Sequence, residues 1–350
     1  MNIRRLLIIQ TAFIGDVVLT LPVAQRVHRV FPHCEIAFLA IPSAAPLLDN
    51  RSDIQRVIHY DKRRRQRGLQ GFLEIVRLIR KESYDLAIIP HRSVRSAAIA
   101  AAARIPRRIG FDSSTGKFLL TDAVHYRNTV HEIERNLDLL NPLGIPTDPR
   151  ELPVLYPNAE DENVVDHALM EGSSAGGHTL IAVAPGSVWA TKRWPAERYA
   201  ELCRLLEDHG YGVVLIGGEG DSRLNAEVAA RSKAHSINLT GKLTLLQSAA
   251  LLRRCALLVT NDSAPQHIAV AVKTPVVAIF GATVPAFGFA PVGPLDIVVE
   301  THGLACRPCA IHGGDHCPIH TFACMLQISA QKVFETLRST LQQSGVSSNS

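Results

Sequence analysis

The stretch VTNDSAPQH, residues 259–267, joins a short apolar run to the start of a helical pattern. The residues before it, 256–260, predict a buried strand, and residues 264–272 predict a helix with Pro265 in its first turn, where a missing N–H group costs nothing. Free N–H groups and the helix dipole make such a junction a seat for a phosphate. The simpler alternative is that Asp262 or Ser263 only caps the helix and that His267 is structural.

The same alternation of strand and helix runs outward from this junction through most of the chain. In the second half, strands are expected at 179–184, 212–217, 236–239, 256–260 and 275–280, and helices at 196–209, 222–233, 244–253 and 264–272. In the first half, strands are expected at 6–9, 35–41, 56–60 and 85–90, and helices from Asp16 to about Phe31 and at 93–104. This spacing predicts an α/β protein with two doubly wound parallel sheets, whose ligands lie beyond the carboxyl ends of the strands.

The length of 350 residues also suits two cores rather than one. We expect an N-terminal domain over 1–158, a linker over 159–178 with an acidic helix and the run Gly172–Gly177, and a C-terminal domain over 179–326. Residues 327–350 are expected to form a last helix and a disordered tail. With 47% hydrophobic residues, the composition excludes a disordered, collagen-like or disulfide-framework protein.

The first 22 residues imitate a signal peptide, because two arginines precede an apolar run. Gln10 and Asp16 interrupt that run, so a buried first strand is the better interpretation, and no later stretch is long and apolar enough to span a membrane. We therefore expect a cytoplasmic protein that rests on a membrane surface. Cys34, Cys203 and Cys255 lie in apolar patterns and are expected in the cores.

Other predicted strand ends of the second half carry residues suited to a nucleotide. Ser187 follows the first strand, and Lys192 in the motif TKRWP is able to neutralise a diphosphate as a point charge. Glu219 in GGEGD is placed to accept hydrogen bonds from a ribose. Thr240 and Gly241 lie in a third loop, NLTGK. Each signal is weak alone, but together they predict an anion and nucleotide site.

The order of motifs PGS, TKRWP, GGEGD, NLTGK, TNDSAPQH and PVVAIFG resembles glycosyltransferase family 9, the ADP-heptose:lipopolysaccharide heptosyltransferases. The N-terminal GDVVLTLP, which contains Asp16, matches as well. The resemblance covers nearly the whole chain and implies two facing Rossmann-like domains of the GT-B type. In that family the C-terminal domain holds the nucleotide sugar and the N-terminal domain receives the acceptor. The members that add the second heptose are the most similar.

The resemblance also implies roles for single residues. Asp16 would be the general base that takes the proton of the acceptor hydroxyl in an inverting transfer; the alternative is that Asp16 caps the following helix. Thr240 and Gly241 would border the adenine, and Glu219 would contact the ribose of an ADP-heptose donor. The diphosphate would be held by Ser187, Lys192, Asp262, Ser263, Ala264 and His267. No DxD pair stands at a donor position, so neither a metal nor a redox cofactor is expected for transfer.

The basic residues gather in the first half, where Arg63, Arg64 and Arg65 belong to the run DKRRRQR and Arg92 follows a predicted strand. Such a run is either a solvated face or the rim of a site for a phosphorylated acceptor, such as the lipopolysaccharide inner core. No nucleic-acid motif accompanies the charge, and aromatic residues make up only 5% of the chain, so nucleic acid is not expected as a partner.

Four cysteines cluster near the C-terminus, at Cys306, Cys309, Cys317 and Cys324. Three interpretations stay open: a structural metal such as zinc, free or occasionally disulfide-bonded thiols, and an iron–sulfur cluster or redox role. The wide spacing of the second pair departs from a zinc ribbon.

Two alternatives to a heptosyltransferase remain at this stage. One is a GT-B enzyme with another nucleotide-sugar donor, such as a UDP-sugar. The other is a non-catalytic nucleotide-sugar-binding protein, which has no need of a carboxylate at Asp16. We expect the protein to be a monomer.

Overall fold

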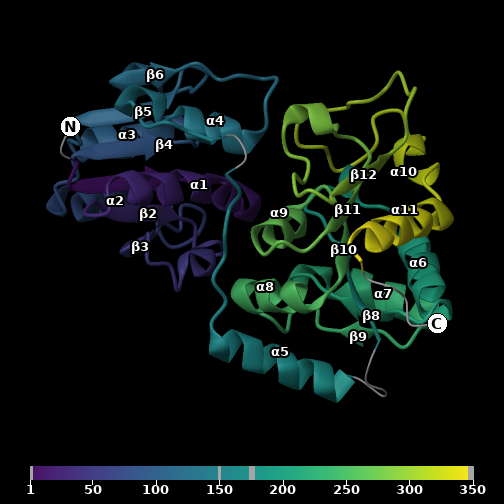
Figure 1. Ribbon diagram of the computed structural model, residues 1–350. Helices are drawn as coiled ribbons and strands as arrows, with labels where there is room; N and C mark the ends of the chain where they lie inside the picture. Colours follow the sequence, from purple (N-terminus) through teal and green to yellow (C-terminus); the bar gives the residue numbers. More distant parts are fainter. Residues whose placement is uncertain (1–2, 149–150, 173–177, 346–350) are drawn as a thin grey trace. The chain divides into compact units, whose positions relative to one another are not determined.

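A computed structural model describes residues 3–148, 151–172 and 178–345 of the chain (Figure 1). The chain divides into two compact units, Met1–Tyr156 and Pro157–Ser350. Each unit is built around one six-stranded parallel sheet, so the expected α/β class with two doubly wound sheets is confirmed.

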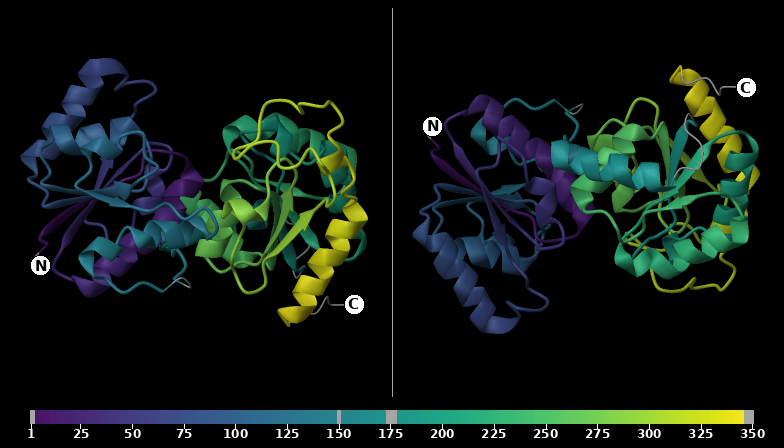
Figure 2. Two further views of the ribbon diagram at one scale, coloured as in Figure 1. Left: turned by 90° about the horizontal axis from the view of Figure 1, so that it is seen from above. Right: turned by 90° about the horizontal axis from the view of Figure 1, so that it is seen from below.

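Unit 1 has the strand order β3-β2-β1-β4-β5-β6. Its strands are β1 Arg5–Ile9, β2 Glu35–Ala40, β3 Arg56–His59, β4 Leu86–Ile89, β5 Arg107–Phe111 and β6 Asp122–Val124. Its α-helices are α1 Ile14–Val30, α2 Gly68–Lys81, α3 Val94–Ala102 and α4 Glu132–Asp138. Helices α1 (purple) and α2 (slate blue) cover opposite faces of the sheet (Figure 2). Residues 6–9 of β1 are therefore apolar throughout and fully buried.

Unit 2 has the order β12-β11-β10-β7-β8-β9. Its strands are β7 Leu180–Ala184, β8 Gly212–Leu215, β9 Ile237–Asn238, β10 Leu257–Asn261, β11 Val276–Phe280 and β12 Ile297–Glu300. Its α-helices are α5 Ala159–Gly172, α6 Ala196–Asp208, α7 Ser222–Ser232, α8 Leu245–Arg254, α9 Ala264–Ala271, α10 Ala323–Leu326 and α11 Ala330–Gln343. Trp194, Tyr199 and Phe334 are the largest fully buried side chains of a core between the sheet, α6 and α11.

The structure adds three strands that the sequence patterns did not predict, β5, β6 and β12. β5 begins with two arginines, and β6 is only three residues long at the sheet edge, so neither shows an apolar run. The helix expected from Asp16 begins two residues earlier, at Ile14, so Asp16 lies in its first turn.

Most of the expected linker is helical. α5 occupies Ala159–Gly172 and packs on α8, where Glu162 forms ion pairs with Arg253 at 3.0 Å and Arg254 at 3.1 Å. Residues 173–177 of the Gly/Ser run, and 346–350 of the expected tail, lie outside the described residues. No helix of the described ranges is long and apolar enough to cross a membrane. Cys34, Cys203 and Cys255 are buried, as expected.

Candidate functional site

The strand order of each sheet reverses at one point, and polar loops follow the strands there. In unit 2 the reversal lies between β7 and β10, which are neighbours. The loop from Pro185 to Arg193 follows β7, and Asp262 follows β10. Open parallel sheets bind ligands outside such a switch point, so these two segments form the candidate site of unit 2.

An ion pair joins the two segments. Lys192 Nζ lies 2.6 Å from Asp262 Oδ2, and the two side chains are only 13% and 8% exposed. Asp262 is held from two further sides. Thr283 Oγ1, after β11, donates to Asp262 Oδ2 at 2.7 Å, and Gln266 Nε2 donates to Asp262 Oδ1 at 3.0 Å. The carboxylate is thus fixed, and it fixes the lysine.

The start of α9 has no side-chain cap. Ser263 occupies the N-cap position in an extended conformation, with φ −153° and ψ 172°, but makes no cap hydrogen bond. Its hydroxyl lies 3.4 Å from the carbonyl oxygen of Asn261 and 3.3 Å from Thr260 Oγ1. The capping alternative for Asp262 and Ser263 therefore does not describe their side chains. N–H groups at a helix start without a side-chain cap suit an anion.

Asn261 is a positioning residue that the sequence reasoning missed. Its side chain is fully buried and bridges the two segments. Oδ1 accepts from the backbone N–H of Trp194 at 3.0 Å and from the Tyr199 hydroxyl at 3.0 Å, while Nδ2 donates to the Pro185 carbonyl at 2.7 Å. The polar residue at the end of an apolar strand was the only signal in the sequence.

The remaining predicted donor loops lie side by side. The Gly241 N–H donates to the Gly217 carbonyl at 3.0 Å, which ties the loop after β9 to the loop after β8. Gly186 and Gly217 both border the Asp221 carboxylate, and a Cβ on Gly186 would come within 2.3 Å of Asp221 Oδ1. A side chain at Gly186 would therefore displace the Asp221 carboxylate.

The other predicted donor residues differ in exposure. Glu219 is exposed in a 3-10 turn, Glu219–Asp221, and Ser187 and Ala264 are half-buried. Thr240 is buried, and its hydroxyl accepts from Asn225 Nδ2 at 2.6 Å. His267 is 7% exposed, in the first turns of α9. The structure thus brings all of these positions to the carboxyl edge of one sheet.

The segment that contains the four clustered cysteines, residues 306–324, is called the cysteine segment. It packs on the loop that carries Lys192, a contact that the sequence did not suggest. The Thr191 N–H donates to the Gly314 carbonyl at 3.0 Å, and the Gly314 N–H donates to Thr191 Oγ1 at 2.8 Å. The Arg307 guanidinium anchors the same segment to the end of β11, donating to the Thr283 carbonyl at 2.7 Å and pairing with Glu300.

All seven cysteines are free thiols. The Phe322 N–H, 3.4 Å from Cys317 Sγ, is the main cause that lowers the pKa of Cys317, whereas burial raises the pKa of Cys309 and of Cys324. Within residues 3–148, 151–172 and 178–345, no group of three or more His, Cys, Asp and Glu side chains is arranged to hold a metal ion. The described arrangement of Cys306, Cys309, Cys317 and Cys324 therefore shows no zinc or iron–sulfur site.

In unit 1 the strand order reverses between β1 and β4. Asp16 lies just beyond β1 and is half-buried. Its Oδ2 accepts the Phe13 N–H at 3.0 Å, so the capping alternative describes one of its interactions. A carboxylate in the first turn of a helix is stabilised by the dipole. This contact fixes the carboxylate at the start of α1.

Cationic side chains surround the same switch point. Lys62 Nζ donates to Thr11 Oγ1 at 3.4 Å, and His91 Nδ1 lies 3.1 Å from that hydroxyl and 3.0 Å from Ser96 Oγ. Burial, followed by the charges of Lys62 and Arg92, lowers the pKa of His91 to about 4. Burial and the neighbouring Arg63 and Arg95 lower the pKa of Lys62.

The four arginines predicted for the acceptor side are not paired with carboxylates of the described residues. Arg63 lies over the Phe13 ring at 5.9 Å, and Arg92 over the Tyr126 ring at 4.2 Å. Arg64 and Arg65 are exposed, and their backbone N–H groups donate to Asp61. None of these four guanidinium groups forms an ion pair with a carboxylate of the described residues. The edge of unit 1 therefore favours an anionic ligand.

A buried polar cluster supports this edge and was also missed. Glu132 Oε2 accepts from Arg135 Nη1 at 2.8 Å and from the Tyr126 hydroxyl at 2.9 Å. Burial is the main cause that raises the pKa of Glu132, and the charge of Asp16 adds to it, whereas Arg135 opposes the shift. The same Tyr126 ring carries Arg92, so the cluster positions one of the cationic groups.

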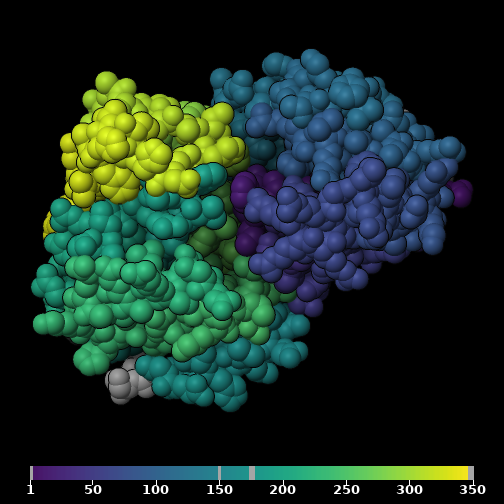
Figure 3. Space-filling view, turned by 180° about the vertical axis from the view of Figure 1, so that it is seen from behind, coloured from purple at the N-terminus to yellow at the C-terminus, as the bar shows by residue number. Residues whose placement is uncertain are grey.

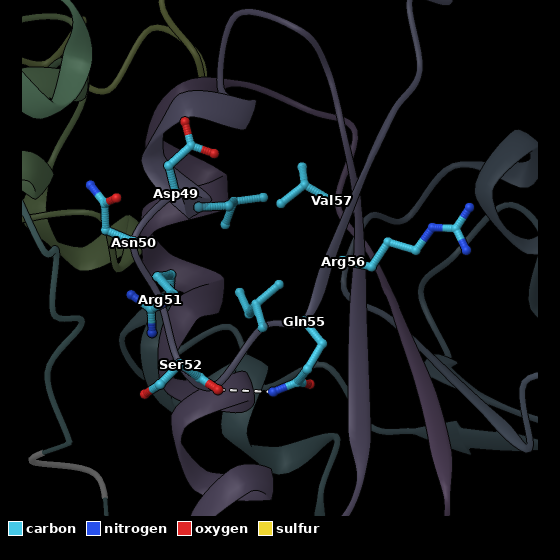
Figure 4. Close-up of a pocket in the computed structure, with 9 residues that line it drawn as sticks. Asp49, Asn50, Arg51, Ser52, Gln55, Arg56 and Val57 are labelled. Atoms are coloured by element: carbon cyan, nitrogen blue, oxygen red, sulfur yellow. Dashed lines mark hydrogen bonds between the residues drawn. The ribbon is translucent and has the colours of Figure 1, made fainter.

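The structure also has an open pocket elsewhere in unit 1, between residues 48 and 57 (Figure 4). Arg51 is turned away into a buried ion pair with Asp53, and Gln55 Nε2 donates to the Ser52 carbonyl at 2.8 Å. The pocket contains none of the predicted site residues.

Comparison with known proteins identifies the family. Residues 72–314 match the model of glycosyltransferase family 9 (heptosyltransferase). The chain is 27% identical to lipopolysaccharide heptosyltransferase 2 of Salmonella typhimurium, over 98% of this chain and 100% of the relative. It is 28% identical to lipopolysaccharide heptosyltransferase 2 of Escherichia coli K12, over 81% and 84%.

Solved structures agree with this. The structure of E. coli ADP-heptose lps heptosyltransferase II aligns with a TM-score of 0.78 and 25% identity, over 97% of this chain and 99% of that chain. A glycosyltransferase family 9 protein from Veillonella parvula has the same fold, with a TM-score of 0.87 and 24% identity over 98% of both chains. With the family match spanning more than half of its length, the chain belongs to glycosyltransferase family 9, the heptosyltransferases.

Proposed function

We propose that this glycosyltransferase transfers a heptose from ADP-heptose to the inner core of lipopolysaccharide, adding the second heptose with inversion. The names of the relatives support the donor and the acceptor class. The observation that carries the proposal is the fixed Lys192–Asp262 pair beside the uncapped start of α9. A cation and a helix start without a side-chain cap, both at a switch point, suit a nucleoside diphosphate.

The donor side comprises unit 2 residues at the carboxyl ends of its strands: Ser187, Lys192, Glu219, Thr240, Gly241, Asp262, Ser263, Ala264 and His267. Lys192 and the first turn of α9 would hold the diphosphate. Glu219, being exposed, is free to accept from the ribose hydroxyls, and the loop with Thr240 and Gly241 would border the adenine. The C-terminal domain expected over residues 179–326, which lies within unit 2, would thus bind the donor.

In the proposed reaction, an Asp16 carboxylate oxygen takes the proton of the acceptor hydroxyl. The hydroxyl oxygen attacks the anomeric carbon from the side opposite ADP, and the bond from that carbon to the phosphate oxygen breaks in the same displacement. The electron pair leaves with ADP, whose growing negative charge is stabilised by Lys192 and the helix start. The transfer uses only these groups of the chain.

The acceptor side is proposed in unit 1, where Arg63, Arg64, Arg65 and Arg92 lack carboxylate partners among the described residues. The inner core carries phosphates and carboxylates, which guanidinium groups bind well. We propose that the enzyme is a monomer and that it acts in the cytoplasm, at the inner face of the inner membrane. Nucleic acid is not proposed as a partner.

A transfer assay tests the proposal. ADP-heptose is offered with core acceptors that lack the first, second or third heptose, and ADP release is measured. ADP should be released with the acceptor that bears one heptose. If ADP is released with no acceptor of the series, the proposal is wrong. Competition of ADP against UDP and GDP tests the alternative donor, because a UDP-sugar enzyme would prefer UDP. Binding of ADP-heptose without turnover on any acceptor would favour the non-catalytic binder.

A further inference from the structure

Three large apolar side chains of unit 1 are exposed where three segments begin. Leu69 in the first turn of α2 is 73% exposed, Val94 at the start of α3 is 45% exposed, and Phe118 in the 3-10 turn Lys117–Leu119 is 75% exposed. Single exposed apolar residues are common on soluble proteins and need no explanation. What distinguishes these three is that their segments, α2, α3 and the turn Lys117–Leu119, are joined by contacts through α3.

Direct contacts join the three segments. Arg95 Nη2, in the first turn of α3, donates to the Gly68 carbonyl at 3.0 Å, which ties α3 to the start of α2. On the other side the Val94 N–H donates to Thr115 Oγ1 at 2.9 Å. A Cβ on Gly116 would lie only 2.9 Å from Val94 Cα, so the turn with Phe118 packs against α3. We call Leu69, Val94 and Phe118 the apolar patch.

The chain around the apolar patch is cationic. Residues 62–73, 86–111 and 113–121 contain no Asp or Glu. Arg67 and Lys117 are exposed, and each is within two residues of a patch member. The described structure gives neither side chain a carboxylate partner. An apolar surface with a rim of free cations complements a layer that has apolar chains beneath anionic groups.

The position of the patch in the fold agrees with this. α2 follows β3 and α3 follows β4, so both helices begin at the carboxyl edge of the sheet, the edge at which Asp16 lies. Figure 3 shows the segment with α2, in slate blue, on an open face of unit 1. A surface at this edge stands next to the proposed acceptor site.

We propose that the apolar patch docks unit 1 on an anionic phospholipid bilayer. Phe118, Leu69 and Val94 enter the boundary between headgroups and acyl chains, and Arg67 and Lys117 lie among the lipid phosphates. The inference rests on the proposed function only for the choice of membrane, because the acceptor is a membrane glycolipid. It assigns these residues to the bilayer and not to the sugar acceptor.

Sedimentation with vesicles tests the docking. The protein should bind vesicles of phosphatidylethanolamine and phosphatidylglycerol, and bind pure phosphatidylcholine much less. The double variant Leu69→Ser/Phe118→Ser should lose at least tenfold in partition, because the bilayer no longer buries two large apolar groups. Arg67→Gln and Lys117→Gln should each cost about fivefold, and added salt should do the same for the wild type.

Matched controls lie in unit 2. Met170 on α5 is 74% exposed, and Arg204 on α6 is exposed, so Met170→Ser and Arg204→Gln should leave vesicle binding unchanged. Equal losses in these controls, or a wild type that does not bind anionic vesicles, would overturn the inference.

A lipid-free core oligosaccharide separates this inference from the proposed function. With that acceptor, Leu69→Ser/Phe118→Ser should turn over like the wild type. If the wild type transfers heptose to the lipid-free oligosaccharide but does not bind vesicles, the proposed function stands and the docking surface is refuted. Vesicle binding that depends on the patch, without any transfer, would do the reverse.

Discussion

Lys192 Nζ and Asp262 Oδ2 lie 2.6 Å apart and join the two loops that flank the switch point of unit 2. The pair holds the lysine where the first turn of α9 begins. A bound diphosphate would therefore contact a lysine that is already in position, and this lysine would stay paired with Asp262. Preorganisation of this kind lowers the cost of stabilising a leaving group.

Lys192→Met should remove this cation while keeping the length of the side chain. We expect kcat/KM for ADP-heptose to fall about 100-fold, since one preorganised donor to a developing charge has this order of effect. Initial-rate kinetics at varied donor concentration measure it. Lys233→Met, at an exposed lysine after α7, is the control and should behave as the wild type.

Thr283→Val should loosen Asp262, because valine keeps the shape but cannot donate to Oδ2. The free energy of unfolding should fall by about 1 kcal/mol, the usual net worth of a buried hydrogen bond, and the donor KM should rise. Denaturant unfolding and kinetics measure the two effects. Thr283→Ser retains the hydroxyl and should recover most of the donor KM; a Ser variant as impaired as Val would argue against this bond.

Gly313→Ala tests whether the cysteine segment positions Lys192. Gly313 has φ +81°, and a Cβ there would lie 3.0 Å from Lys192 Cγ and from Thr191 Oγ1. Gly303 has φ +77° with no atom within 4 Å of such a Cβ. Both alanines carry about 1 kcal/mol of left-handed strain, but only Gly313→Ala should raise the donor KM. Equal donor KM values for the two variants would refute the positioning role.

His91 makes the stability of unit 1 depend on pH. Its pKa is lowered from 6.5 to about 4, so between those values the unfolded chain binds a proton that the folded chain excludes. Stability should therefore fall as pH drops from 6.5 towards 4, by a total on the order of 3 kcal/mol. Urea unfolding at several pH values measures the slope. His91→Gln should flatten this part of the curve; an unchanged slope would show that other groups cause it.

How much of the molecule the sequence predicts depends on the range of the interactions. The strands that are buried on both faces, such as β1 and β10, are visible as apolar runs, and their polar ends mark Asp16 and Asp262. By contrast, β5 and β6 carry charged residues, and their place in the sheet is evident only from the strands with which they pair.

The supporting shell of the site could not be predicted, because its contacts cross long stretches of sequence. Thr283 meets Asp262, Asn261 meets Trp194, and Gly314 meets Thr191 only in the folded unit. The cysteine spacing predicted a metal as one of three roles, yet the described thiols are not grouped for one. Their segment instead packs against the loop of the proposed donor lysine.

The most direct test of the proposed heptosyl transfer is product analysis with the wild type and Asp16→Asn. Asparagine retains an oxygen to accept the Phe13 N–H, so stability and ADP affinity should stay near those of the wild type, but it cannot take the acceptor proton. With ADP-heptose and a core acceptor bearing one heptose, the wild type should add one heptose per ADP released. Asp16→Asn should be slower by roughly 10²–10⁴ in kcat. No heptose added by the wild type, or equal turnover by the folded variant, would contradict the account.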